Sequence, residues 1–148
     1  MFLLDTNVVS ELRNIRLDRA DPNVAQWTDS VDAVDLYVSA ITVFELTIGV
    51  LRAERLDAVQ GAAVRAWVDG QELPAFAGRI LSVCVAVAER SALLHLPDPR
   101  PICDGLIAAQ ALMHRMIVLT RNVADFAPKG VATVNLRVAP KLSTLCAA

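Results

Sequence analysis

Residues 2–13 read FLLDTNVVSELR, and their pattern predicts how the fold begins. The first three residues, Phe2 to Leu4, have the apolar character of a short buried strand, and Val8 to Arg13 carry apolar residues at helical spacing. Asp5 stands between the two, directly after the strand. In a parallel sheet this position lies at the carboxyl edge, where such sheets present a crevice to ligands. The opening therefore predicts an α/β fold with an acidic residue at a ligand-binding edge.

The rest of the chain repeats this alternation. Further apolar or β-branched runs of strand length are Leu36 to Val38, Ile80 to Val83, Ile117 to Thr120 and Val131 to Val134. Apolar residues at helical spacing are found in Ile41 to Ala53, Asp57 to Gly70, Val85 to Leu94 and Ile102 to His114. We therefore expect an α/β architecture in which helices flank a central, mainly parallel β-sheet of about five strands.

Length and composition favour one compact domain that has partners. A chain of 148 residues suits a single domain, residues 1–148, around one core. Its hydrophobic content of 55% and mean hydropathy of +0.45 are high for a monomer, so we expect a partner protein or a second copy to cover part of the surface. The net charge of -2 predicts no overall attraction for nucleic acid.

Neither a membrane span nor a disulfide framework is predicted. The apolar runs are shorter than the roughly 18 residues of a span, and Met1 to Leu4 meets Asp5 without a basic region before it. Cys84, Cys103 and Cys146 form no CxxC pair, so they are expected to be free thiols. These features predict a cytoplasmic protein with no membrane association.

Four carboxylates are placed so that they could converge. Asp5 and Asp125 follow the first and fourth predicted strands, Asp125 after a short loop of residues 121–124. Glu45 and Asp104 lie in the first turns of two predicted apolar helices. Carboxylates that converge in an apolar setting repel one another unless protons or cations compensate them. Mg²⁺ or Mn²⁺ suits such a group, because these ions prefer oxygen ligands and need neither His nor Cys.

Each carboxylate also has a structural interpretation. Asp5 and Asp104 could cap the helices beside them, because Asp is a preferred N-cap residue. Glu45 follows Thr42 at the spacing of a capping box, and Asp125 could be a turn residue. Taken singly, each structural role is the more common outcome. A shared cation site accounts for all of them together.

The histidines and tryptophans favour structural roles. His95 and His114 are the only histidines, and His114 suits the end of a helix, which argues against a His-based zinc site. Trp27 and Trp67 could stack on bases. Each follows a valine at helical spacing, however, which favours core or interface packing.

The chain resembles the PIN-domain proteins in four segments, which are in order FLLDTNVVSELR, LYVSAITVFELTIGV, PICDGLIAAQAL and IVLTRNVADF. The likeness runs from Phe2 to around Asn135 and is closest to the VapC-type toxins. It implies a PIN-like fold, hydrolysis of RNA by a metal-dependent ribonuclease, and the toxin role in a toxin–antitoxin pair. It further implies a homodimer and a cognate antitoxin that covers the site. DNA contact is expected only through the antitoxin, because the chain has no basic helix-turn-helix pattern.

Carried over residue by residue, the resemblance implies that Asp5, Glu45, Asp104 and Asp125 form the acidic metal site. Asp5 and Asp104 are expected to be the direct ligands of one or two Mg²⁺ or Mn²⁺ ions. Thr6 resembles the hydroxyl residue that holds the site beside Asp5.

Asn7, Asn122 and Gly105 are the other residues of the motifs that can be compared with those of PIN-domain proteins. Asn7 and Asn122 resemble polar residues that orient the acidic cluster or the scissile phosphate. Some PIN-domain proteins carry an Asp where this chain has Asn122, which leaves the division of roles between Asn122 and Asp125 open. Gly105 replaces the Ala that is common after the third acidic residue, a small change.

The sequence also offers candidates for contacts with the RNA and with the antitoxin. Arg13, Arg16 or Arg121 could hold phosphates that flank the scissile bond, because a guanidinium group suits bidentate phosphate contact. The predicted helices Ile41 to Ala53 and Asp57 to Gly70 are our expectation for the antitoxin surface.

Two other functions are weighed against this one. An aspartyl-phosphate phosphatase or receiver domain would use Asp5 as its nucleophile, but the chain lacks a second Asp at position 7, and Lys129 and Lys141 come late in the sequence. A catalytically inactive, PIN-like dimeric interaction module would keep the fold without the reaction. Because every acidic residue is present, the enzyme is preferred, and metal-dependent RNA cleavage separates the two.

Overall fold

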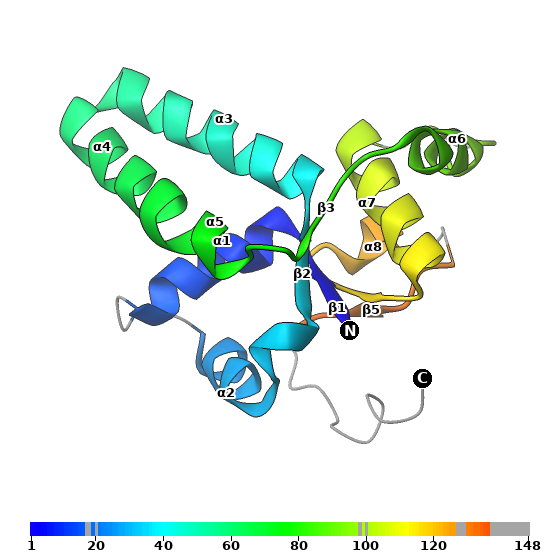
Figure 1. Cartoon of the computed structure of the whole chain (residues 1–148), viewed down its shortest axis with the longest axis horizontal. Coiled ribbons are helices and arrows are strands. Elements are labelled where there is room, and N and C mark those ends of the chain that lie inside the picture. The colour runs from blue at the N-terminus through cyan, green and yellow to red at the C-terminus, as the bar shows by residue number, and fades with distance from the viewer. Residues whose placement is uncertain (17–18, 20, 98, 100, 127–129, 137–148) are drawn as a thin grey trace.

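The structure, a computed structural model, describes residues 1–16, 19, 21–97, 99, 101–126 and 130–136 (Figure 1). Cys146, Lys129 and Lys141 lie outside these residues, as do parts of the predicted loop from Leu96 to Pro101. The side chain of Arg16 is also outside the description.

The central sheet consists of five parallel strands in the order β3-β2-β1-β4-β5. The strands are β1 (Phe2–Leu4), β2 (Leu36–Ser39), β3 (Ile80–Leu81), β4 (Ile117–Leu119) and β5 (Thr133–Val134). The predicted fold class is confirmed, although β3 and β5 are shorter than expected. Since β1 is the central strand, Asp5 emerges between the ends of β2 and β4, and its backbone N–H donates to the Leu119 carbonyl at 3.0 Å.

The helices cover both faces of this sheet. They are α1 (Thr6–Arg16), α2 (Pro22–Ser30), α3 (Ala40–Leu56), α4 (Ala58–Trp67), α5 (Leu73–Ala75), α6 (Val85–Leu93), α7 (Ile102–His114) and α8 (Val123–Phe126), with a 3-10 turn at Ala33–Asp35 and a π-helical turn at Val68–Glu72. Figure 1 shows α1, α3 and α4 on one side of the sheet and α6, α7 and α8 on the other. Among the described residues, no helix combines the length and apolar character needed to cross a membrane.

Neighbouring residues of β1 belong to two different cores. Leu4 packs in the core formed with α1 to α4, which also contains Trp27 and Trp67. Leu3 packs in the core formed with α7 and α8, beside Phe126. Side chains of a strand alternate between its faces, so one short strand joins both layers. Trp27 and Trp67 are 3% and 8% exposed, which confirms that they are packing residues.

Three helical details differ from the sequence-based expectation. The helix predicted for residues 57–70 is α-helical only to Trp67 and continues as the π-helical turn. α2 was not predicted as a separate helix; Asp21 caps it, and Pro22 occupies its first turn. The predicted loop of residues 121–124 is shorter, because α8 already begins at Val123.

Candidate active site

A pocket of about 490 Å³ opens where the carboxyl ends of the central strands meet the helices. Three of the predicted acidic residues line it, namely Asp5 after β1, Glu45 on α3 and Asp104 on α7. Asn122, after β4, lines it as well, whereas Asp125 is not among the described residues of the lining. The fold therefore brings three of the four predicted carboxylates to one pocket, from three separate elements.

Asp5 is held by donors on both of its oxygens. Oδ1 accepts from the Thr6 backbone N–H at 2.7 Å, and Oδ2 accepts from the Thr120 hydroxyl at 2.7 Å and from the Asn7 amide at 2.5 Å. The residue is only 6% exposed. Burial raises the pKa of the Asp5 carboxyl, the Glu45 charge raises it further, and the three hydrogen bonds oppose this shift. Asp5 is thus a desolvated carboxylate fixed in place by its neighbours.

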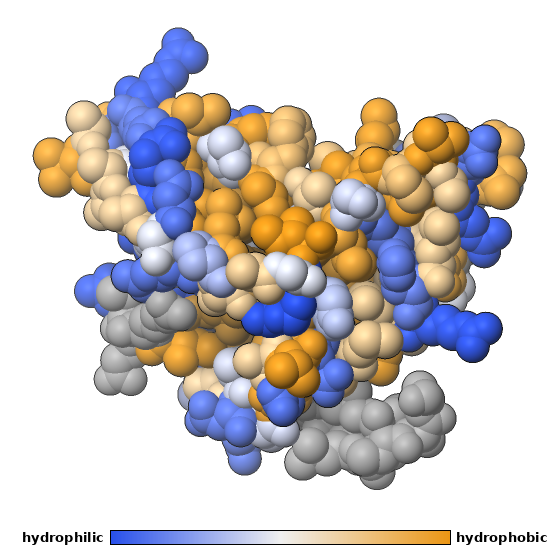
Figure 2. Space-filling view, viewed as in Figure 1, coloured by the Kyte–Doolittle hydropathy of each residue, from blue (hydrophilic) through white to orange (hydrophobic). Residues whose placement is uncertain are grey.

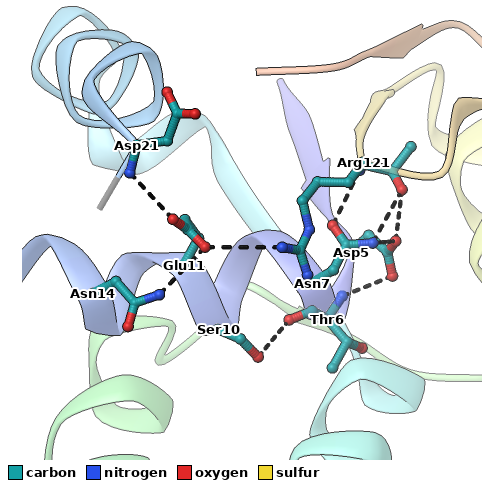
Figure 3. A network of polar contacts seen from close by, with 9 residues as sticks. Asp5, Thr6, Asn7, Ser10, Glu11, Asn14, Asp21 and Arg121 are labelled. Atoms are coloured by element: carbon teal, nitrogen blue, oxygen red, sulfur yellow. Dashed lines mark hydrogen bonds and ion pairs between the residues drawn. The ribbon is translucent and has the colours of Figure 1, made fainter. Parts of the chain in front are cut away.

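Asn7 and Thr120 connect Asp5 to the segment that follows β4. Figure 3 shows Asn7 bonded both to Asp5 and to Arg121 of that segment. The Asn7 amide also donates to the Thr120 hydroxyl at 3.3 Å, and its Oδ1 accepts from the Arg121 backbone N–H at 3.1 Å. The Thr120 hydroxyl accepts from the backbone N–H of Asn122 at 3.0 Å. In the sequence, Thr120 ends a predicted strand and has no predicted functional role. Its only signal was a hydroxyl at the end of a strand beside β1.

Glu45 lies deeper in its helix than expected. α3 begins at Ala40, and its N-cap is Ser39, whose hydroxyl accepts from the Ile41 N–H at 2.9 Å. Glu45 is therefore not part of a capping box with Thr42. Its Oε2 instead accepts a hydrogen bond from the Thr6 hydroxyl. Glu45 thus has no capping role, and its side chain contacts Thr6 at the start of α1.

Asp104 lies in the first turn of α7 but does not cap it. The N-cap is Pro101, which makes no side-chain capping bond. Cys103, the preceding residue, also lines the pocket. Burial raises the pKa of the Cys103 thiol, and the carboxylates of Glu45 and Asp104 add to this effect. The neighbourhood therefore favours the protonated thiol.

Gly105 has a packing reason for lacking a side chain. A Cβ at this position would lie 2.6 Å from His95 Nε2 and 3.0 Å from Ser91 Oγ. The space that a methyl group would need beside Asp104 is thus filled by the imidazole of His95. The departure from Ala that was noted in the sequence is explained by this contact.

Arg13 and Arg121, two of the three arginines that the sequence suggests for phosphate contact, make other contacts. The Arg13 guanidinium stacks over the Trp67 ring at 5.7 Å, and Arg121 Nη1 lies 4.0 Å from Glu11 Oε2. Neither is among the described residues of the pocket lining. Arg52, which sequence reasoning missed, is in that lining. Its signal was its spacing of seven residues after Glu45, which puts both on one face of a helix.

In its chemistry the pocket suits a hard divalent cation. Its ionisable donors include carboxylate oxygens, and no histidine is among the described lining residues. Within the described ranges, however, no three His, Cys, Asp or Glu side chains lie close enough together to hold a metal ion. Mg²⁺ keeps several waters and commonly takes only one or two carboxylates. The carboxylates of this pocket therefore fit such an ion, although they do not form a complete set of protein ligands around it.

Comparison with known proteins gives consistent results. A model of the PIN domain matches residues 2–127. Toxin FitB of Neisseria gonorrhoeae is 39% identical over 142 residues, which cover 91% of this chain and 97% of that protein. VapC ribonuclease Y4jK of Sinorhizobium fredii is 35% identical over 140 residues, with 91% and 96% covered. The crystal structure of FitAcB from Neisseria gonorrhoeae superposes with a TM-score of 0.81 at 36% identity, over 92% of this chain and 98% of that one.

Proposed function

The chain belongs to the PIN-domain family, and from this premise we propose that it is a VapC-type ribonuclease, the toxin of a toxin–antitoxin pair. It hydrolyses RNA phosphodiester bonds with the help of Mg²⁺ or Mn²⁺. The observation that carries this proposal is the pocket lined by three carboxylates, those of Asp5 directly after β1, Glu45 on α3 and Asp104 on α7. Oxygen donors gathered without histidine suit these two cations.

Each acidic residue has a role in the proposed site. Asp5 and Asp104 would hold the cation, and Glu45 would add negative charge beside it from α3. Asp125, on α8 and not among the described residues of the lining, is the fourth acidic residue of the proposal. A divalent cation in such a site activates a water molecule and neutralises charge that develops on the phosphate.

The other polar residues position this machinery. Thr6 donates to Glu45 and, through its backbone N–H, to Asp5. Asn7 holds the second oxygen of Asp5. Asn122 lines the pocket, where its amide reaches the scissile phosphate in this proposal. Ligands fixed in this way need little rearrangement when the substrate arrives.

The proposal includes partners and location. The chain forms a homodimer, binds a cognate antitoxin that covers the site, contacts DNA only through that antitoxin, and acts in the cytoplasm. Large exposed apolar side chains on the α3–α4 hairpin support a protein partner there: Phe44, Leu51, Leu56 and Val59 are 54%, 53%, 87% and 83% exposed.

The test is cleavage of a mixed RNA pool by purified, antitoxin-free protein with Mg²⁺, Mn²⁺ or EDTA. We expect cleavage by the wild type only with metal, and a loss of at least about 100-fold in Asp5→Asn and Asp104→Asn, because each removes a proposed ligand. Glu89→Gln, at an exposed position on α6, is the matched control and is expected to cleave like the wild type.

Two outcomes contradict the proposal. If the wild type cuts no RNA with any metal, the inactive interaction module becomes the better description of the chain. If the two Asn variants cut as fast as Glu89→Gln, the acidic residues of this pocket do not perform the reaction.

A further inference from the structure

We propose that Arg52 of α3 binds a phosphate of single-stranded RNA that flanks the scissile phosphate. The inference deepens the proposed ribonuclease function and rests on it. Arg52 is the only basic side chain among the described residues that line the carboxylate pocket. A pocket of carboxylates repels the RNA backbone, and a positively charged side chain in its lining offsets this repulsion.

The position of Arg52 on its helix indicates which phosphate it meets. Glu45, Ile48 and Arg52 all line the pocket and follow one another at spacings of three and four residues, so they form one face of α3. At a rise of about 1.5 Å per residue, the backbone of Arg52 lies roughly 10 Å along the helix axis from that of Glu45. This offset separates Arg52 from the acidic centre and favours contact with a neighbouring phosphate.

Arg52 also has no partner among the described residues. In the part of the chain that the structure describes, no hydrogen bond or ion pair involves its side chain. Other arginines are occupied: Arg65 makes a bidentate pair with Glu54 at 2.5 and 2.9 Å, and Arg79 donates to the carbonyls of Ala33, Leu36 and Ala75. An unpaired guanidinium that opens onto the site is available for a bidentate contact with an external phosphate.

The chain supplies a matched control for this residue. Arg55 lies on the last turn of the same helix and is exposed, but it is not among the described residues of the pocket lining. Arg52→Gln and Arg55→Gln remove the same charge from the same helix. Both side chains are exposed, so neither change is expected to alter the melting temperature.

The experiment measures kcat and KM for cleavage of a short single-stranded RNA with Mg²⁺ over a range of salt concentrations. A flanking phosphate is held equally in the ground and transition states, so its contact affects KM and leaves kcat nearly unchanged. We expect Arg52→Gln to raise KM about tenfold, and the slope of log(kcat/KM) against log salt to become shallower by about 0.7. The KM of Arg52→Lys should lie between those of the wild type and Arg52→Gln, since lysine keeps the charge without the bidentate geometry. Arg55→Gln should have the KM and the salt slope of the wild type.

The inference is overturned if Arg52→Gln and Arg55→Gln share the same KM and salt slope, or if Arg52→Gln lowers kcat alone. Failure of the ribonuclease function looks different, because the wild type then cleaves nothing. In that case the same RNA, carrying a fluorescent label, is titrated with each protein in EDTA. Weaker binding by Arg52→Gln than by Arg55→Gln supports the phosphate contact, and equal binding rejects it.

Discussion

Asp5 is a buried carboxylate, and its burial affects how it binds protons and cations. The residue is 6% exposed and its carboxylate accepts three hydrogen bonds, yet burial still raises its pKa. The fold therefore binds a proton at Asp5 more tightly than the unfolded chain does. A divalent cation can compensate the same charge, so protons and metal ions are expected to compete for this residue.

Asp5→Asn tests this account through the pH dependence of stability in EDTA. Because the folded pKa lies above the ordinary value of 3.8, the stabilisation from Asp5 is complete below 3.8 and is lost as the pH rises through the folded pKa. The unfolding free energy of the wild type should thus fall relative to that of Asp5→Asn as the pH rises from 3.8 toward neutrality. Urea unfolding at a series of pH values measures this difference.

The control for that series is Asp29→Asn, at an exposed position on α2. If the difference between wild type and Asp5→Asn stays constant with pH, burial does not govern the Asp5 carboxyl. Adding Mg²⁺ to about 100 times its Kd at neutral pH should stabilise the wild type by roughly 2–3 kcal/mol and Asp5→Asn by much less.

Among the elements, the α3–α4 hairpin does most to shape the site, because one face of α3 carries Glu45 and Arg52. The hairpin is closed by a tight helix contact at Gly61, where a Cβ would lie 2.3 Å from Glu54 Cα. The Glu54–Arg65 ion pair lies nearby, but its side chains are 32% and 41% exposed, so solvent screens it. The close backbone approach at Gly61 is therefore expected to contribute more than the ion pair to the packing of α3 against α4.

Gly61→Ala and Gly49→Ala test this contact within one hairpin. At Gly61 the obstacle is backbone, which must shift, and we expect a loss of about 2–3 kcal/mol in unfolding free energy. At Gly49, within α3, nothing lies within 4 Å of an added Cβ, so Ala should stabilise the helix by about 0.5–1 kcal/mol. Urea unfolding followed by circular dichroism measures both. Equal effects at the two positions would refute the close approach.

For the whole molecule, the apolar surface stands out. Figure 2 shows apolar side chains over the α3–α4 hairpin and over α6, which lie on opposite sides of the sheet. Their exposure matches the high hydrophobic content of the sequence, 55%. Both surfaces are therefore candidates for the antitoxin and for a second copy of the chain.

Charged substitutions distinguish the two surfaces. Leu51→Glu and Val59→Glu alter the hairpin, and Val85→Glu, at a side chain 75% exposed, alters α6. If the antitoxin binds the hairpin, the first two should weaken its binding at least about tenfold, because each places a charge where apolar area would be buried. Val85→Glu should bind antitoxin normally. Titration calorimetry against the cognate antitoxin measures this, and the reverse ranking would place the antitoxin on α6.

Local patterns in the sequence were sufficient to predict the layered fold. Apolar runs and helical spacing predicted all five strands and the helices α1, α3, α4, α6 and α7 near their observed positions, because burial on a strand or helix face sets these periods along the chain. The place of Asp5 at the ligand-binding edge followed from the strand before it. The residue types at Asp5, Glu45 and Asp104 also indicated cation chemistry before any contact was known.

Which side chains share the pocket depends on the packing between elements, and no local pattern in the sequence predicts it. The tertiary structure brought Asn122 and Arg52 into the pocket lining, whereas Asp125 is not among the described lining residues. It also paired Glu45 with Thr6 instead of with a helix cap, and it joined Thr120 to Asp5 by a hydrogen bond. These outcomes depend on how helices and strands lie against one another, and a residue's neighbours in space come from segments distant in the chain: Thr120 meets Asp5 across 115 positions. Periodicity within one element assigns a side chain to a face, whereas packing between elements determines what that face meets.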